Sequence, residues 1–155
     1  MSQTTPEQRL AEAGLQLPAP QKPSGNYLPV RRVDKLLFVA GHGPKDAAGN
    51  YMCGRLSGEP DIARGYEAAR AAALNLLATV KQSVGELDAV DGVLKVLGMV
   101  NAAPDFTAHP RVIDGCSDVL VTAFGEQGLH ARSAVGMSSL PHGMSVEIEA
   151  ILVLK

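Results

Sequence analysis

Three charged residues near the C-terminus are the first candidates for chemistry. Glu147 and Glu149 lie two residues apart in the apolar segment SVEIEA, and Arg132 lies in the segment HARSAVGM before it. Carboxylates can transfer protons, and a guanidinium group can hold an anion. Whether these side chains could act together depends on the strands that carry them.

Residues 131–138 and 145–154 are expected to form two strands joined at LPHG. A four-residue loop and a symmetric register would give a hairpin with Gly136 opposite Glu147 and Ala134 opposite Glu149. Alternation would then place Arg132, opposite Ile151, on the face that carries both acids. The other face would pack on helices through Ser133, Val135, Met137, Val146, Ile148 and Ala150. Small residues opposite the acids predict a hollow with charge in it.

This charged face has two interpretations. Most charged strand residues are exposed, and cross-strand pairs there contribute only a few tenths of a kcal/mol, so the face could simply be solvated. Ile151 and Val153 continue the same face as apolar residues, however, which favours a partner such as another subunit. In the assumed register Arg132 and Glu147 lie roughly 13 Å apart, too far for one small molecule unless a neighbouring chain contributes.

The rest of the chain predicts an α+β fold. A helix starting at Thr5 and Pro6 should run to Gly14, and the Pro-rich segment LPAPQKPSG should follow it as a surface linker. Residues 1–25 are therefore expected to form an N-terminal helix and linker, and residues 26–155 one domain. There LLFVAG and GVLKVLGMVNA predict strands, residues 60–85 a long helix, and residues 104–125 a second helical region interrupted at Pro110. This order predicts a mixed sheet with two helices on one face.

Composition excludes several classes of protein. The chain has 155 residues, a net charge of −2 and no tryptophan, and its basic residues form no stripe, which argues against nucleic-acid binding. It has no apolar run of membrane-spanning length and no signal-peptide pattern. Two cysteines without a C-x-x-C pair favour a reducing compartment. We therefore expect a cytoplasmic protein without a nucleic-acid or membrane partner.

Several motifs together resemble the RidA/YjgF family of enamine/imine deaminases, over roughly residues 26–154. FVAGHGP is similar to the family's SGQxP strand end, ARSAV to its xARSxV segment, and LPHGMSVEIEAI to its LPxxxxVEIEAIA terminus. The last motif is specific, whereas the others alone would be weak. The segments PSGNYLPV, VIDGCSD and FGEQGLHARSAVG look closer to a branch of the family with longer N-termini.

The resemblance implies a chorismate-mutase-like fold, a barrel-like homotrimer and active sites in clefts between subunits. It also implies hydrolysis of 2-aminoacrylate and related imines to 2-keto acids and ammonia, without a metal or cofactor. By this likeness Arg132 matches the arginine that holds the substrate carboxylate, and Glu147 the acid that orients the attacking water. Tyr27 matches the tyrosine of the cleft, and Gly41 would let the ligand approach the backbone.

The chain departs from the family pattern in the cleft lining. Ala40 replaces the usual serine, His42 the usual glutamine, and Ala134 stands where many members carry cysteine. The cleft asparagine falls at Asp114 or Gly115, depending on the placement of a gap. We expect His42 and Asp114 to lie near the substrate.

The remaining histidines and cysteines show no spacing typical of metal ligands or nucleophiles, so no metal site is expected and both cysteines are read as small buried residues. Two functions stay open. The first is an imine or enamine deaminase acting on small carboxylates. The second is a trimer that binds 2-keto acids without turnover, which the altered lining would allow. A ribonuclease is a third possibility that the composition gives little reason to favour.

Overall fold

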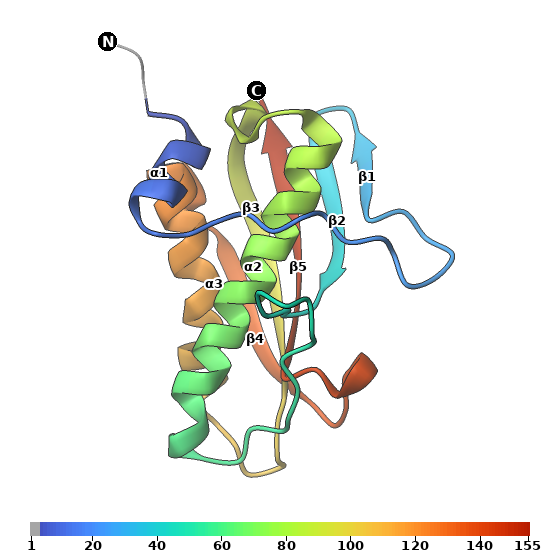
Figure 1. The fold of residues 1–155 in the computed structure, drawn as a ribbon, viewed down its shortest axis with the longest axis vertical. Coiled ribbons are helices and arrows are strands. Elements are labelled where there is room, and N and C mark those ends of the chain that lie inside the picture. The colour runs from blue at the N-terminus through green and yellow to red at the C-terminus, as the bar shows by residue number, and fades with distance from the viewer. Residues whose placement is uncertain (1–3) are drawn as a thin grey trace.

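The computed structural model describes residues 4–155 and contains a five-stranded mixed sheet with helices packed on one face (Figure 1). Across the sheet the strands run in the order β1 (Val30–Val33), β2 (Leu36–His42), β5 (Val146–Leu154), β3 (Val90–Asn101) and β4 (Ala131–Met137). Strands β3 and β4 are parallel, and the other neighbours are antiparallel. This architecture confirms the predicted α+β fold.

Within residues 4–155 the three α-helices are α1 (Pro6–Glu12), α2 (Ile62–Val84) and α3 (His109–Phe124). The predicted start of α1 is confirmed by a capping box, in which the Thr5 hydroxyl accepts a hydrogen bond from the Gln8 backbone N–H and the Gln8 side chain accepts one from the Thr5 N–H. The expected interruption at Pro110 is wrong, because α3 begins at His109. Proline fits there since N–H groups of a first helical turn need no intrahelical acceptor. No α-helix in the part of the chain that the structure describes could span a membrane.

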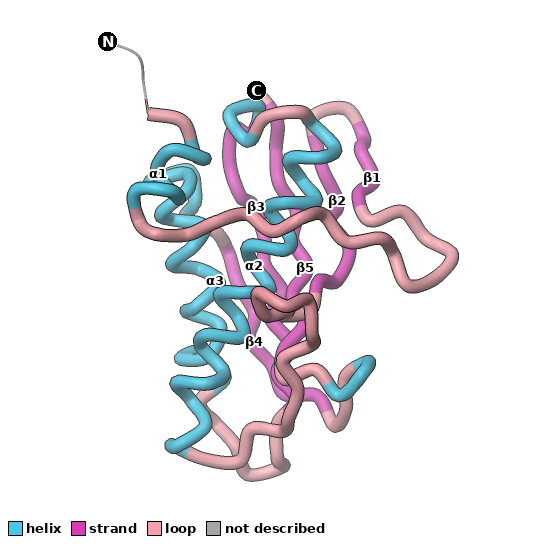
Figure 2. The backbone as a smooth tube through the Cα atoms, viewed as in Figure 1, coloured by secondary structure: helices cyan, strands magenta, loops and turns pink. Residues whose placement is uncertain are grey.

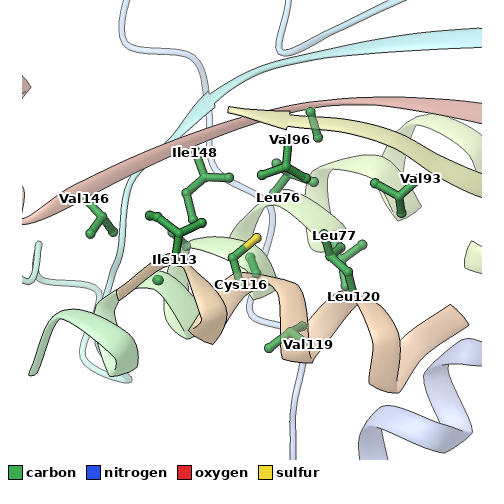
Figure 3. Close-up of a cluster of buried hydrophobic side chains, with 14 of the residues drawn as sticks. Leu76, Leu77, Val93, Val96, Ile113, Cys116, Val119, Leu120, Val146 and Ile148 are labelled. Carbon is green, nitrogen blue, oxygen red and sulfur yellow. The ribbon is translucent and has the colours of Figure 1, made fainter. Parts of the chain in front are cut away.

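The hydrophobic core lies between the sheet and the helices α2 and α3 (Figure 3). Val96 and Ile148 project from the sheet onto Leu76 of α2 and Ile113 of α3, and all four side chains are buried. Cys116 is part of this core, and burial raises the pKa of its thiol to about 12. The other cysteine, Cys53, is exposed, so the expectation that both are buried is wrong for Cys53.

The predicted terminal hairpin is also wrong. Strand β4 pairs with β3 in parallel, and β5 lies between β2 and β3, so β4 and β5 are not neighbours. Helix α3 supplies the crossover that parallel strands require. Strand β5 is the more apolar of the two and buries Val146, Ile148 and Leu152 completely, which suits a central position, whereas the mostly part-exposed β4 suits an edge.

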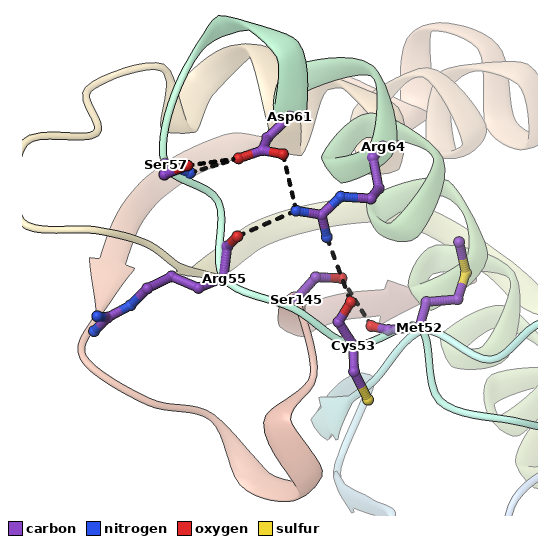
Figure 4. A network of polar contacts seen from close by, with 7 residues as sticks. All are labelled: Met52, Cys53, Arg55, Ser57, Asp61, Arg64 and Ser145. Atoms are coloured by element: carbon purple, nitrogen blue, oxygen red, sulfur yellow. Dashed lines mark hydrogen bonds and ion pairs between the residues drawn. The ribbon is translucent and has the colours of Figure 1, made fainter.

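A polar network holds the connection between β2 and α2 in place (Figure 4). The Arg64 guanidinium donates to the carbonyls of Cys53 and Arg55, at 3.4 and 3.1 Å, and forms an ion pair with Asp61 at 3.1 Å. The Ser145 hydroxyl donates to the Met52 carbonyl at 2.9 Å, which ties this connection to the start of β5. These bonds hold the segment that carries Tyr51 against the end of the sheet.

Candidate active site

Glu147 lies on the sheet face that the helices leave uncovered. It pairs with Met99 of β3, while its neighbours Val146 and Ile148 are buried toward the helices. The predicted alternation along residues 145–154 is therefore confirmed. Strand β2 bulges beside it, with Ala40 and Gly41 between the pairs Val39–Ala150 and His42–Ile148. Bulges at this kind of position re-aim the backbone next to a site.

Gly41 and Glu147 are fitted to each other. A Cβ atom on Gly41 would lie 2.9 Å from Cδ of Glu147 and still closer to Oε1, so any larger residue at position 41 would displace the carboxylate. The hollow beside the acid was expected over Ala134 and Gly136, and this expectation is wrong because β4 is not next to β5. The space for the Glu147 carboxylate comes instead from Gly41 on β2, which has no side chain.

A cavity of about 70 Å³, the Glu147 cavity, opens beside this carboxylate. Tyr27, Tyr51, His142 and Met144 form part of its wall, together with the backbone around Gly41. The rings of Tyr51 and His142 stack with centroids 4.7 Å apart. His142 has a positive φ of 57°, which is unusual for a residue with a side chain, and this turn presents the ring to Tyr51.

The environment of Glu147 favours its protonated form. Burial raises the pKa of this carboxyl above its usual range, and the negative charge of Glu149 on the same face raises it further. A carboxyl with a raised pKa is suited to accept a proton and to give it back during a reaction. The site can therefore perform general acid–base chemistry on a small molecule.

Two further candidates border the same cavity. Tyr27 is about half exposed, and its hydroxyl oxygen accepts a hydrogen bond from the Ser24 backbone N–H, which leaves its own proton free to donate. The His42 ring, by contrast, is buried: Nδ1 donates to the Ala40 carbonyl at 2.6 Å, and Nε2 accepts from the Thr79 hydroxyl at 2.9 Å. Burial lowers the pKa of His42, so the ring is neutral and ties β2 to α2.

Arg132 lies away from this cavity, at the edge of the sheet. Its guanidinium donates to Asp114 at 2.9 Å, to Ser117 at 3.0 Å and to the Pro110 carbonyl at 3.3 Å, all on α3. The Ser117 hydroxyl in turn donates to Nε2 of His130, whose Nδ1 donates to the Gly128 carbonyl. The structure therefore brings Arg132 and Asp114 together as an ion pair within one chain.

Within one chain, Arg132 and Glu147 lie on opposite faces of the sheet. Val96 of β3 pairs with Arg132 on one side and with Ala150 on the other, and it is fully buried under the helices. Directly paired residues point to the same face, so Arg132 shares the helix side. Glu147, by its pairing with Met99, points to the uncovered side. The expectation that both occupy one face is wrong, so one chain cannot bring them to the same ligand.

Residues that sequence reasoning missed complete the cavity wall. They are Gln21, Lys22, Pro23 and Ser24 from the segment before Tyr27, and Tyr51, His142 and Met144 from two loops. Of these segments, only the loop LPHG could have been linked to the site from the sequence, because it lies inside the C-terminal family motif. Among residues 4–155, no cluster of three or more histidine, cysteine or acidic side chains is placed to hold a metal ion.

The fold and the Glu147 cavity define an α+β protein of the chorismate-mutase-like class. A family model described as "YjgF/chorismate_mutase-like, putative endoribonuclease" matches residues 7–147. The chain therefore belongs to the YjgF family, which also contains RidA, and the resemblance of its motifs is confirmed.

Close relatives share nearly the whole chain. Protein TCP17 from Trypanosoma cruzi is 38% identical over 94% of this chain and 91% of its own. The crystal structure of Atu1372, a protein "with unknown function" from Agrobacterium tumefaciens, is 40% identical with a TM-score of 0.87, and covers 97% of this chain and 94% of its own. A "putative endoribonuclease" from Shewanella oneidensis is 33% identical with a TM-score of 0.91, and covers 97% and 99%.

Proposed function

We propose that this protein hydrolyses small 2-imino acids and their enamine tautomers to 2-keto acids and ammonia, in the cytoplasm, at clefts between subunits of a homotrimer. The observation that carries the proposal is the half-buried Glu147 carboxyl, held over Gly41 in a small cavity with its pKa raised. Glu147 is the first glutamate of the motif VEIEA. The family resemblance implies that the acid at this position activates the attacking water.

The chemistry needs one group that first accepts and then donates a proton. Glu147 takes a proton from water as the water oxygen bonds to the carbon of the protonated imine, and the C=N electron pair moves to the nitrogen, which gives a neutral carbinolamine. The acid returns this proton to the nitrogen, the C–N bond breaks with loss of the hydroxyl proton, and ammonia leaves as the carbonyl forms. The Tyr27 hydroxyl borders the cavity and can donate a hydrogen bond to the intermediate.

Arg132 of a neighbouring subunit supplies the anchor for the substrate carboxylate. Three donor contacts of its guanidinium are used within the described chain, by Asp114, Ser117 and Pro110, and an arginine carries five N–H groups. The remaining two suffice for a bidentate carboxylate. The location of Arg132 on the edge strand β4 supports an approach by a second chain.

The uncovered sheet face supports assembly with further copies of the chain. It carries Leu97, Met99, Ile151 and Val153 beside the exposed side chains of Phe38 and Val135. Apolar side chains of this number on one face favour burial against a partner. The proposal requires that the trimer which buries this face also brings Arg132, from the edge strand β4 of one chain, to Glu147 of the next.

The test measures 2-keto acid released from imines that an amino-acid oxidase generates in place, relative to spontaneous hydrolysis. Wild-type protein is expected to accelerate the release, and Glu147→Gln and Arg132→Ala to return it to background. Absence of acceleration by the wild type, or an Arg132→Ala variant as active as the wild type, would contradict the proposal.

A mixing experiment tests the shared site directly. When Glu147→Gln and Arg132→Ala chains are co-refolded, about a quarter of the clefts should combine both wild-type residues by random pairing, and activity should return. If each site used both residues from one chain, the mixture would stay inactive. Analytical ultracentrifugation of each preparation is expected to give the mass of a trimer.

A second candidate function is binding of small 2-keto acids without turnover. The observation that favours it is the Arg132–Asp114 ion pair at 2.9 Å, because Asp114 competes with a substrate carboxylate for the same guanidinium. Saturable calorimetric binding of pyruvate, lost in Arg132→Ala, together with no imine hydrolysis would support this alternative. Hydrolysis that Glu147→Gln abolishes would exclude it.

A further inference from the structure

The segment between α1 and β1 forms a strap over the helix layer. This strap, residues 16–25, runs from α1 across α2 toward the loop that precedes β1 (Figures 1 and 2). Leu17, Pro18 and Pro20 line a groove together with Ala78 and Gly85, which places the first half of the strap directly against α2. The strap lies outside the part of the chain whose motifs indicated the family.

The strap is fixed at its N-terminal end. Leu10 and Leu15 are buried in the core, and the Glu7 carboxylate accepts a hydrogen bond from the Leu87 N–H at 2.8 Å and pairs with Lys81 at 3.3 Å. Prolines at positions 18, 20 and 23 restrict φ along the strap itself. A segment held in this way can form a lasting wall of a site.

The second half of the strap forms a wall of the Glu147 cavity. Gln21, Lys22, Pro23 and Ser24 border it, as do Ala40 and Gly41 of β2. The Glu147 cavity is small, about 70 Å³, so a ligand beside the carboxylate would lie close to this wall. The strap thus limits the size of the substrate side chain.

Gln21 carries an unsatisfied hydrogen-bond donor. Its Nε2 atom is buried and, within residues 4–155, it is the one buried side-chain nitrogen or oxygen atom without a hydrogen-bond partner. Leaving a buried donor unpaired is costly, and native proteins retain such groups where a ligand or a bound water completes them. Because Gln21 borders the Glu147 cavity, a rotation of its amide would bring this donor to an acceptor atom of a ligand there.

We propose that Gln21 is a specificity-determining residue, which donates a hydrogen bond from Nε2 to an oxygen atom on the substrate side chain. This inference rests on the proposed function. It predicts a preference for small 2-imino acids that carry a hydroxyl or carbonyl oxygen next to the imine carbon, over apolar analogues of the same size.

The test uses two ligands that differ by one group. 3-Hydroxypyruvate and 2-oxobutanoate exchange a hydroxyl for a methyl group at the same position, and their binding to the full-length protein is measured by calorimetry. The wild type should bind 3-hydroxypyruvate about five- to tenfold more tightly, as one buried hydrogen bond gives. Gln21→Leu should remove this preference and leave the affinity for 2-oxobutanoate unchanged.

The matched control is Gln16→Leu, which changes an exposed residue of the same strap that lies outside the Glu147 cavity. It should keep the wild-type preference. In the absence of ligand, Gln21→Leu should not lower the thermal midpoint, because Nε2 has no partner to lose. Three results would each overturn the inference. The wild type could bind both ligands with equal affinity, Gln21→Leu could keep the preference for 3-hydroxypyruvate, or Gln21→Leu could lose affinity for both ligands by the same factor.

Hydrolysis of the imines made from serine and 2-aminobutyrate separates this inference from the proposed function. Imine hydrolysis with equal kcat/KM values for both would leave the function standing and overturn the role of Gln21. A binding preference that Gln21→Leu removes, in a protein that hydrolyses neither imine, would support the role of Gln21 and overturn the deaminase.

Discussion

Glu147 and Gly41 form one structural unit across two neighbouring strands. The glutamate on β5 turns its carboxylate into space that exists only because residue 41, at the bulge of β2, has no side chain. The acid is thereby held half-buried, and its pKa is raised without a salt bridge or a hydrogen bond to lower it. Position 41 therefore controls the chemistry of position 147.

Gly41→Ala should displace the Glu147 carboxylate and reduce kcat/KM for imine hydrolysis at least tenfold. Overpacking of this kind costs about 1–3 kcal/mol of folding free energy, so the protein should still fold. The measurements are steady-state kinetics and a urea unfolding curve. Gly58→Ala is the matched control, because a Cβ there would make only an ordinary contact of 3.8 Å with Pro60. Wild-type activity in Gly41→Ala would contradict the fit described above.

Glu147→Gln should lower kcat about 100- to 10,000-fold, as expected for loss of a general base. The same change should raise the free energy of unfolding at pH 7. A carboxyl whose pKa is raised by folding destabilises the folded state where it is ionised, and this cost disappears as the pH falls through the raised pKa. The stability difference between variant and wild type should therefore vanish below about pH 4, near the ordinary glutamate pKa. A variant less stable than the wild type at pH 7 would contradict the burial of an ionised group.

Glu149→Gln should leave the proposed imine hydrolysis in place but shift its pH dependence. The negative charge of Glu149 is the second cause of the raised Glu147 pKa, after burial. Removing this charge lowers the Glu147 pKa, so the acid limb of the kcat/KM profile should move to lower pH. An unchanged limb would show that the two acids do not interact.

His42 should make the folded state sensitive to mild acid. Burial lowers its pKa, so the folded protein binds a proton at this ring less readily than the unfolded chain does. Stability should therefore fall as the pH drops below the ordinary histidine value of about 6.5 and approaches the lowered pKa. His42→Gln should flatten this part of the stability curve, which thermal unfolding between pH 7.5 and 5 would measure.

The fold was largely predictable from local patterns. Strict alternation along residues 145–154 identified Val146, Ile148 and Ala150 as core residues, because apolar and charged side chains contrast sharply there. Strand β4 offers no such contrast: Arg132, Ala134 and Gly136 alternate with Ser133 and Val135, so its orientation depended on an assumed partner. The strand–helix–strand order of β3, α3 and β4 is compatible with the parallel pair that forms, but the short LPHG loop favoured the hairpin.

The candidate site was predictable only where a motif carried it. Glu147 and Gly41 belong to segments that resemble the family, and the structure places them together. Gln21, Tyr51 and His142 reach the same cavity from three separate loops, and neither spacing nor periodicity connects such positions. The separation of Arg132 from Glu147 follows from which strands pair, a long-range property that the sequence of either strand does not contain.

Asp114→Asn should strengthen binding of carboxylate ligands, because Asp114 now occupies part of the Arg132 guanidinium at 2.9 Å. Asparagine keeps the size of the side chain but removes the competing charge, so KM for a 2-imino acid should fall roughly three- to tenfold at unchanged kcat. Stability should change by less than about 1 kcal/mol, since this ion pair is largely exposed on the Asp114 side.

Asp118→Asn is the control on the same helix, where the carboxylate accepts a hydrogen bond from Tyr66 and does not contact Arg132. A raised KM in Asp114→Asn would instead show that Asp114 positions the guanidinium for the substrate, and Asp114→Ala would then raise KM further.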